Sequence, residues 1–478
     1  MVWLLASCVI IAAYGQFSAF AAFPIILVVV LSVRRWRSKA AVAGVALAAA
    51  CFVRGGLDYG SLKADGERLV EAGAANRTLE GWVCGFPEYG PARVRFPFRT
   101  TLGGRTVTVL ASGAVFGVNY GDSLTLSGRL SAGRSDRAGY LLSKGAAGYF
   151  RVRRGGVLGW RKAASGSSLY SAAGWAHESA RCRLARGLGT RCGLPLGLLI
   201  GDRGWVGRVV EGAFVKLGIT HLLALSGMNL GMIAAAALLV VRRIGVRRNL
   251  ALFVVVTAYV AVVGDVVSLY RAYVMAVWFI LAASLERPLR PIDVLGRAVL
   301  FLLLLAPHLA HSVGFQLSAV ATLAVFLCIR RYHHRTPVGK LRRAGSFAVS
   351  TLRVSLYVQA FVLPLQLRYF GGVSAAGPLA TLLFIPVVGL LLFASWAAVL
   401  VVWAAPPLAT VVFDGLAYLA GGTEWLVLLA SSAAPALVEL PAPNIVLYYG
   451  AQAVFWSGRG KWRIGTAVLL IAVSFLLR

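Results

Sequence analysis

The sequence has few acidic residues and few cysteines. Its 478 residues include 17 aspartates and glutamates against 48 lysines and arginines, a formal net charge of +31. Six cysteines are too few for a disulfide scaffold in a chain of this length. They form no CxxC pair or Cys/His cluster with metal spacing, so the sequence indicates no metal centre. No phosphate-binding GxxxxGK loop and no nucleophile elbow occurs, so we expect neither a bound cofactor nor a catalytic site.

Apolar residues, by contrast, are abundant. They make up 59% of the chain, and only 14% of its residues are charged, against about 25% in a soluble protein. Several runs, for example 311–329 and 375–403, reach about the 20 residues that cross a bilayer. The sequence therefore predicts a polytopic α-helical membrane protein. Its apolar N-terminus has no basic residues before it, and we expect it to remain as an anchor.

One polar segment interrupts this pattern. Residues 77–154 alternate with period two and contain turn glycines, and the segments 93–100 and 105–110 flank Gly103-Gly104 as in a β-hairpin. Several short strands over about 80 residues indicate a small β-barrel. We therefore expect N-terminal transmembrane helices (1–53), a β domain (77–154), a helical connector (165–218) and a transmembrane domain (219–478).

The basic residues outside that segment gather in clusters, at 34–39, 242–248, 286–297, 330–343 and 457–463. The connectors between them are poor in lysine and arginine. Alternating helices place every cluster on one side of the membrane, and the positive-inside rule makes that side cytoplasmic. This predicts a multi-pass membrane protein with residues 54–218 outside the cytoplasm. The charge excess also suits an anionic partner.

The β segment is itself basic and interleaves cations with aromatic residues, namely Arg93, Arg95, Phe96, Phe98, Arg99 and Arg105. OB folds hold single nucleic-acid strands by phosphate contacts and base stacking, which needs this combination. The alternative is a solvated strand face with its aromatic residues in the barrel core, because the alternation puts Arg and Phe on opposite faces.

Polar side chains also stand inside apolar runs, where no water satisfies them. The segment HLLALSGMNLGMI at 221–233 contains three of them, Asp265 and Arg271 bracket a turn, and Gln316 and Ser318 enter another span. Each could line a polar path. Each could equally join helices by hydrogen bonds, with Asp265 and Arg271 as a structural pair.

Four motifs in this order and spacing resemble the competence domain of the ComEC family: GDRGWV (201–206), HLLALSGMN (221–229), SLYRAYVM (268–275) and SVGFQLS (312–318). The resemblance implies an OB-like barrel and a channel in the bacterial inner membrane that takes single-stranded DNA into the cell during natural transformation. It implies a DNA path lined by His221, Ser226, Asn229, Asp265, Arg271, Gln316 and Ser318. Asn229 stands where the family has histidine, which removes an imidazole.

The resemblance also implies partners: an outer receptor for double-stranded DNA, a cytoplasmic helicase-like ATPase and the lipid bilayer. No HxHxDH run occurs, so we expect no metallo-beta-lactamase-like domain. Two other functions remain open, a permease for a small anionic solute using Asp265 and Arg271, and an enzyme on a lipid-linked polymer with His221 as base. Cys182 and Cys192 could form a disulfide in an oxidising space.

Overall fold

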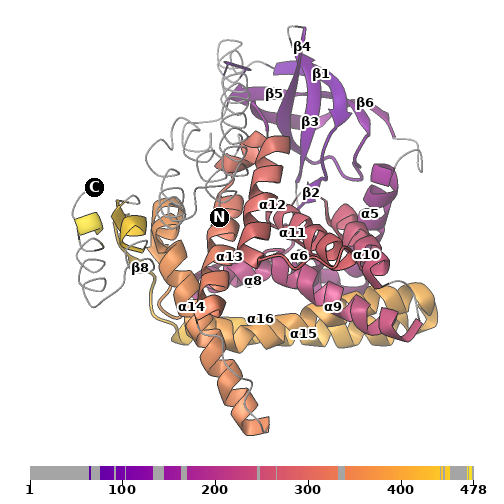
Figure 1. The fold of residues 1–478 in the computed structure, drawn as a ribbon. Coiled ribbons are helices and arrows are strands. Elements are labelled where there is room, and N and C mark those ends of the chain that lie inside the picture. Colours follow the sequence, from indigo (N-terminus) through magenta and orange to yellow (C-terminus); the bar gives the residue numbers. More distant parts are fainter. Residues whose placement is uncertain are drawn as a thin grey trace. The chain divides into compact units, whose positions relative to one another are not determined.

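The computed structural model describes residues 64–65, 76–90, 93–102, 104–132, 141, 145–162, 169–244, 248–264, 266–331, 340–441, 443–444, 447–452, 471 and 473–475 (Figure 1). The expected N-terminal helices (1–53) and Asp265 lie outside these residues. The chain divides into two compact units. We call residues 61–273 with 383–434 the barrel unit and the remainder the second unit, and we describe each by itself.

The polar segment folds as a closed five-stranded barrel (Figure 1). Its strands are β1 (Asn76–Val83), β3 (Val94–Leu102), β4 (Arg105–Gly113), β5 (Ser123–Ala132) and β6 (Gly148–Arg161). Their order is β1-β5-β6-β4-β3, and β1 also pairs with β3 to close the ring. The pairs are antiparallel except β4 with β6. A five-stranded barrel with such crossovers has the architecture of the OB fold.

Period-two alternation builds this barrel. In β3, Val94, Phe96 and Phe98 are buried in the core while Arg95 and Arg99 point outward, because successive side chains of a strand face opposite sides of a sheet. The predicted hairpin is confirmed: β3 and β4 pair down to Leu102 and Arg105, around a turn in which Gly104 has φ +79°. A two-residue strand, β2 (Glu88–Tyr89), pairs antiparallel with the start of β3 at the other end of the barrel.

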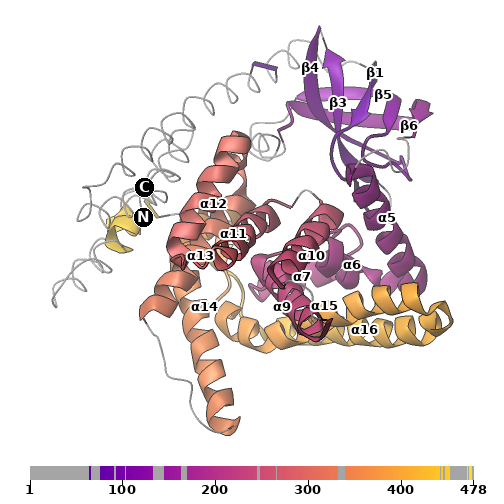
Figure 2. The same ribbon diagram turned by 45° about the vertical axis from the view of Figure 1, so that its right-hand side comes forward.

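Helices complete the barrel unit (Figure 2). They are α5 (Leu169–Leu188), η3 (Gly189–Cys192), α6 (Gly193–Ile200), α7 (Arg208–Lys216), α8 (Thr220–Leu223), α9 (Gly227–Ile244), α10 (Arg248–Val263), the start of α11 (Val267–Ser284), most of α15 (Gly377–Ala404), η5 (Pro406–Leu408) and α16 (Ala409–Ala433). Helix α5 follows the barrel in the chain and packs on α10 and α16.

The second unit is helical as well. It contains the rest of α11, α12 (Pro291–Leu305), η4 (Pro307–His311), α13 (Val313–Arg331), α14 (Lys340–Phe370) and the short pair β7 (Gly372–Val373) and β8 (Val438–Glu439). Helices α13 and α14 pack around Phe361, whose carbonyl accepts a hydrogen bond of 2.8 Å from the Tyr449 hydroxyl.

Among the described residues, five helices are long and apolar enough to cross a membrane: Val267–Ser284, Val313–Arg330, Ala348–Phe370, Gly377–Ala404 and Pro406–Ala433. Gly227–Leu239 and Arg248–Val263 are shorter apolar helices. The predicted fold class, a polytopic helical membrane protein with an inserted small β-barrel, is therefore confirmed.

Candidate functional site

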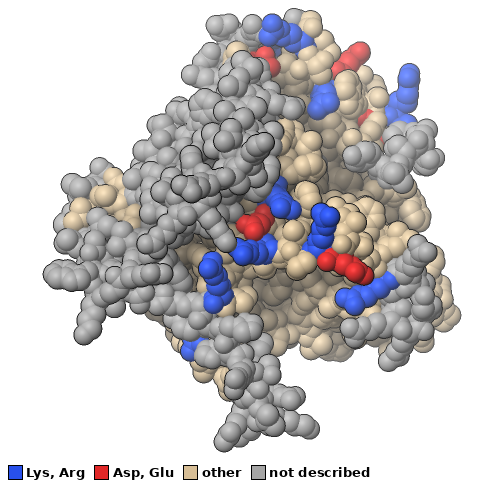
Figure 3. Space-filling view, viewed as in Figure 1, with Lys and Arg blue, Asp and Glu red and all other residues tan. Residues whose placement is uncertain are grey.

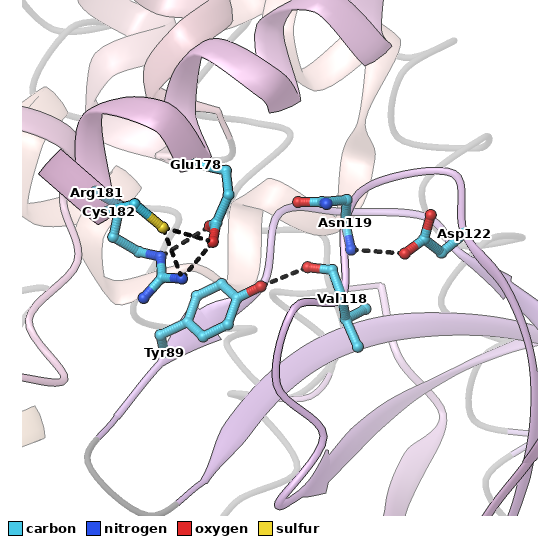
Figure 4. A network of polar contacts seen from close by, with 7 residues as sticks. All are labelled: Tyr89, Val118, Asn119, Asp122, Glu178, Arg181 and Cys182. Carbon is cyan, nitrogen blue, oxygen red and sulfur yellow. Dashed lines mark hydrogen bonds and ion pairs between the residues drawn. The ribbon is translucent and has the colours of Figure 1, made fainter. Parts of the chain in front are cut away.

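A partly buried polar network joins the barrel to α5 (Figure 4). The Arg181 guanidinium lies 3.8 Å over the Tyr89 ring and pairs with the Glu178 carboxylate. The Tyr89 hydroxyl donates 2.5 Å to the Val118 carbonyl. Burial raises the pKa of Tyr89, and the Arg181 partner lowers that of Glu178 despite its burial. Cation, ring and carboxylate thus fix strand β2 against the helices.

The thiol of Cys182 belongs to the same network. Its thiol lies 3.3 Å from a Glu178 oxygen, and burial raises its pKa. Cys192 is buried at the end of η3, and both cysteines are free. The structure therefore does not contain the disulfide that the sequence allowed, because the Cys182 sulfur is directed to Glu178.

The loop formed by the GDRGWV motif packs against strand β2. A Cβ on Gly204 would overlap the Tyr89 carbonyl oxygen, so only glycine lets the loop approach β2. The Asp202 carboxylate is buried and accepts 3.2 Å from the Gly204 amide, while its second oxygen has no hydrogen-bond partner among the described residues. Burial raises the pKa of Asp202 from 3.8 to about 7.

Three of the four motifs meet where the helical path is interrupted. Helix α8 ends at Leu223, Ala224 is extended (φ −77°, ψ 135°), and α9 begins at Gly227. We call residues 224–226 the helix break. A Cβ on Gly201, from GDRGWV, would lie 2.7 Å from the Leu225 side chain, and the Ser268 hydroxyl, from SLYRAYVM, donates 2.6 Å to the Leu225 carbonyl. The motifs therefore hold one feature together.

The polar residues predicted in this region stabilise the helix break. The Ser226 hydroxyl accepts 3.2 Å from the Met228 amide and so caps α9. Asn229 is fully buried, and its amide lies 3.5 Å from the Leu198 carbonyl of α6. Buried backbone groups without helical partners are costly, and neighbouring side chains must satisfy them. Sequence reasoning placed these residues together but did not show the interruption.

Arg271 belongs to α11, and its side chain lies beside the start of α9. It is 5% exposed, and its guanidinium Nη2 is 3.6 Å from the position of a Cβ on Gly227, the first residue of that helix. The first turn of a helix has amide protons without internal acceptors and carries a partial positive charge. The Arg271 guanidinium adds a positive charge beside it. Such an arrangement stabilises an anion, for example a phosphate.

The other predicted path residues have different surroundings. The His221 ring is exposed and hydrogen-bonds the Gly218 carbonyl. Gln316, in the second unit, donates 2.8 Å to the Ala310 carbonyl and accepts 2.8 Å from the Tyr369 hydroxyl. Both ends of its amide are engaged, which favours the interpretation that it joins helices. Ser318 is half-buried on α13.

On the barrel, the arginines are exposed and the phenylalanines are not. Arg93, Arg95, Arg99 and Arg105 are all exposed. Phe96 and Phe98 are fully buried in the core, so these two rings cannot stack on bases, contrary to that prediction. The exposed aromatic residue near the arginines is Trp82, 42% exposed, with the Arg99 guanidinium 6.0 Å from its ring centre.

Strand register gathers further arginines that the sequence analysis missed. Directly opposed positions run Arg95, Ser112, Arg151, Arg129 across β3, β4, β6 and β5. We call this the arginine row. Neighbouring strands lie about 4.8 Å apart, so Arg151 and Arg129 face each other at close range. Like charges in that position destabilise a sheet, and a bound anion would remove the penalty.

Figure 3 shows one face of the molecule, on which Lys and Arg are more frequent than Asp and Glu. Several Lys and Arg side chains gather near the centre of this face with acidic side chains beside them. An open cavity of 530 Å³ lies on the barrel between β1 and β3, lined by Arg77, Thr78, Leu79, Glu80, Thr101 and Leu102. Within the described part of the chain, no group of three His, Cys, Asp or Glu side chains could hold a metal ion.

Comparison with known proteins gives matches to competence proteins. The model of the family described as "Competence protein" matches residues 198–461. ComE operon protein 3 of Bacillus subtilis (strain 168) is 29% identical over 198 residues, 41% of this chain and 24% of that protein. Recombination protein 2 of Haemophilus influenzae is 28% identical over 219 residues, 42% of this chain and 27% of that protein. The alignments thus span about a quarter of these relatives, and no solved structure matches.

Proposed function

Because the chain belongs to the competence protein family, we propose that it is the membrane channel through which one strand of DNA enters the cell during natural transformation. The observation that carries this proposal is the helix break with Arg271 at its edge. We propose that the start of α9 and the Arg271 guanidinium together receive a backbone phosphate of the strand.

The physical argument concerns hydration. A polyanion that crosses a membrane loses water around each phosphate, and fixed donors must replace it without binding so tightly that the strand stops. Interrupted helices supply such donors at membrane depth, because the amide protons in the first turn of the second half have no acceptor within the helix. Ser226 accepts that of Met228. Arg271 adds a charge, and Ser226 and Asn229 keep the interruption in place.

The barrel supplies the surface that first captures the strand. The OB architecture binds oligonucleotides on the outer face of its second and third strands, here β3 and β4. Arg95 and Arg99 stand on that face, and the arginine row continues it across β6 to β5. Trp82, on the neighbouring β1, offers an exposed ring for one base. These contacts require no particular base sequence.

The remaining parts of the proposal concern placement and partners. The alternation of basic clusters supports an inner-membrane location with residues 54–218 outside the cytoplasm. We propose that the barrel receives the strand from a separate receptor for double-stranded DNA and that a cytoplasmic helicase-like ATPase pulls it inward. The chain itself is proposed to act as a conduit and not as an enzyme.

A strain lacking this chain tests the proposal. Labelled double-stranded DNA should still bind to the cells, but no label should become resistant to external nuclease. The intact gene in trans should restore both protected label and transformants. Normal protected label in the deletion strain would contradict the proposal, and loss of surface binding would place the chain at an earlier step.

A further inference from the structure

One end of the barrel carries large exposed apolar side chains. The strand register puts the loop after β4, the start of β5 and the end of β6 at the end opposite the β3–β4 turn. Phe116 in that loop is 53% exposed, and Trp160 near the end of β6 is 39% exposed. Trp175, on α5, is 66% exposed. Several large apolar side chains gathered in one region mark a surface that something covers.

Contacts with α5 and with the turn after α10 fix the position of this end of the barrel relative to those helices. Gly264 follows α10 with φ +83°, and a Cβ there would overlap the ring of Phe86. The Phe86 ring also lies 5.9 Å from that of Tyr120 and 5.3 Å from that of His177. His177 in turn hydrogen-bonds the Val262 carbonyl at 2.8 Å. The end of the barrel therefore rests on the turn between α10 and α11.

The length of α10 does not allow that turn to project beyond the surface of a bilayer that α10 crosses. Helix α10 has 16 residues, a length of about 24 Å, while the hydrocarbon layer is about 30 Å thick. Helix α11, which leaves the same turn, is one of the helices able to cross a membrane. Side chains at the level of Gly264 therefore lie at the height of the lipid headgroups. Trp175 shares that level, because its neighbour Gly174 abuts Tyr120 and Phe86.

The chemistry of this end suits a lipid surface. The Trp160 indole N–H donates 3.0 Å to the Asp122 carboxylate, so the exposed part of the ring is apolar. The Lys162 ammonium lies 5.9 Å over that ring, and Arg161 is exposed beside it. Asp122, the one acidic residue of the segments 115–122 and 157–162, is buried. Aromatic rings with adjacent cations are typical of the layer where acyl chains meet anionic headgroups.

We infer that the surface formed by Phe116, Trp160, Arg161, Lys162 and Trp175, which we call the aromatic rim, is seated in the headgroup layer and binds anionic lipid. This contact holds the barrel at a fixed height above the α10–α11 turn and leaves the β3–β4 turn in water. The inference concerns a lipid partner and does not depend on DNA transport.

Photo-crosslinking of the full chain tests it. The protein is reconstituted in nanodiscs of equal parts phosphatidylglycerol and phosphatidylcholine, with p-benzoylphenylalanine in place of Phe116, Trp175 or, as control, Thr106. Thr106 is exposed beside the β3–β4 turn. Illumination should give lipid adducts at positions 116 and 175 and essentially none at 106, measured by intact mass. Equal yields at all three positions in variants that elute as the wild type would overturn the inference.

A second variant tests the charge. Arg161→Gln with Lys162→Gln should lower the ratio of phosphatidylglycerol to phosphatidylcholine adducts at position 116 by about an order of magnitude. Arg105→Gln, at the far end of the barrel, should leave that ratio unchanged. An unaltered ratio in the double variant would overturn the anionic-lipid assignment. Adducts to single-stranded DNA that displace the lipid adducts at position 116 would show that the rim belongs to the DNA-binding surface instead.

Discussion

The outer wall of the barrel and the helix break use polar side chains in opposite ways. On the barrel, Arg95, Arg129 and Arg151 project from a wall whose core is formed by other residues. At the break, Ser226 and Ser268 hydrogen-bond the backbone that passes beside them. An arginine in water costs the fold little, whereas an unsatisfied backbone group at membrane depth costs several kcal/mol. The barrel arginines are therefore removable, and the serines are structural.

Arg271 shares one property with each of these two groups. It is buried, as Asn229 is, yet it carries a charge like the barrel arginines. A cation and the start of a helix both attract negative charge, so an anion at Gly227 would interact with the two together. Arg271 therefore combines a place in the packed interior with a charge that can bind an anion.

The largest loss of stability is expected from a substitution in the contact between the barrel and the helices. Gly204→Ala would force a Cβ into the Tyr89 carbonyl oxygen, and we expect a loss of about 3 kcal/mol or more of stability and little folded protein. Gly212→Ala is the matched control, because nothing lies near a Cβ there and alanine favours a helix. Folded yield after gel filtration in detergent gives the comparison, and an equal yield for both variants would refute the close approach.

The next effect depends on pH. The pKa of Asp202 is raised from 3.8 to about 7 in the folded protein, so the fold favours its protonated form. Its contribution to stability is present at low pH and is lost as the pH rises toward and through about 7, by up to about 4 kcal/mol.

Asp202→Asn tests this sign. The variant should be more stable than the wild type at about pH 8.5 and should lose less stability between about pH 5.5 and pH 8.5. Thermal unfolding in detergent measures both. Glu211→Gln, at an exposed position of α7, should keep the wild-type pH dependence. If Asp202→Asn keeps it too, the carboxyl is not the titrating group.

A smaller effect is expected in the second unit. Gln316→Leu removes hydrogen bonds to Ala310 and Tyr369 and should cost about 1–3 kcal/mol, whereas Tyr369→Phe should cost about 1 kcal/mol. A double-mutant cycle in detergent should show strong coupling between the two. Additive effects, together with lost DNA entry at normal stability, would move Gln316 from the structural group to the path.

The smallest effect on stability is expected on the barrel wall. Replacing Arg95, Arg129 and Arg151 by glutamine should change stability by less than about 0.5 kcal/mol. The same variant should bind single-stranded DNA with a salt slope about 2 units shallower, since each phosphate contact contributes about 0.7. Fluorescence anisotropy of the full chain at several salt concentrations measures the slope. An unchanged slope would show that the arginine row is only a solvated face.

Patterns within one element were readable from the sequence, and contacts between elements were not. Alternation in residues 93–110 predicted the hairpin, and it also implied that Phe96 and Phe98 face away from the arginines, as they do. Trp82 stands at an outward position of β1 and could have been found by the same alternation. The arginine row needed the pairing of β6 with β4 and β5, which alternation does not specify.

The helix break shows the same limit. The sequence placed Ser226 and Asn229 on one stretch of helix, because spacing alone reports a shared face. The interruption at Ala224 depends on Gly201 and Ser268, which contact Leu225 from distant parts of the chain. Local periodicity carries no signal of such tertiary support.

The most direct test of the central claim is DNA entry per folded molecule in Arg271→Leu, with Ser268→Ala from the same helix as control. Label resistant to external nuclease is divided by the amount of folded protein in the membrane. The account predicts a fall of about tenfold or more for Arg271→Leu, the loss of a charged phosphate contact, with surface binding unchanged. Ser268→Ala should lower the amount of folded protein but not entry per molecule. Normal entry per molecule in Arg271→Leu would contradict the claim.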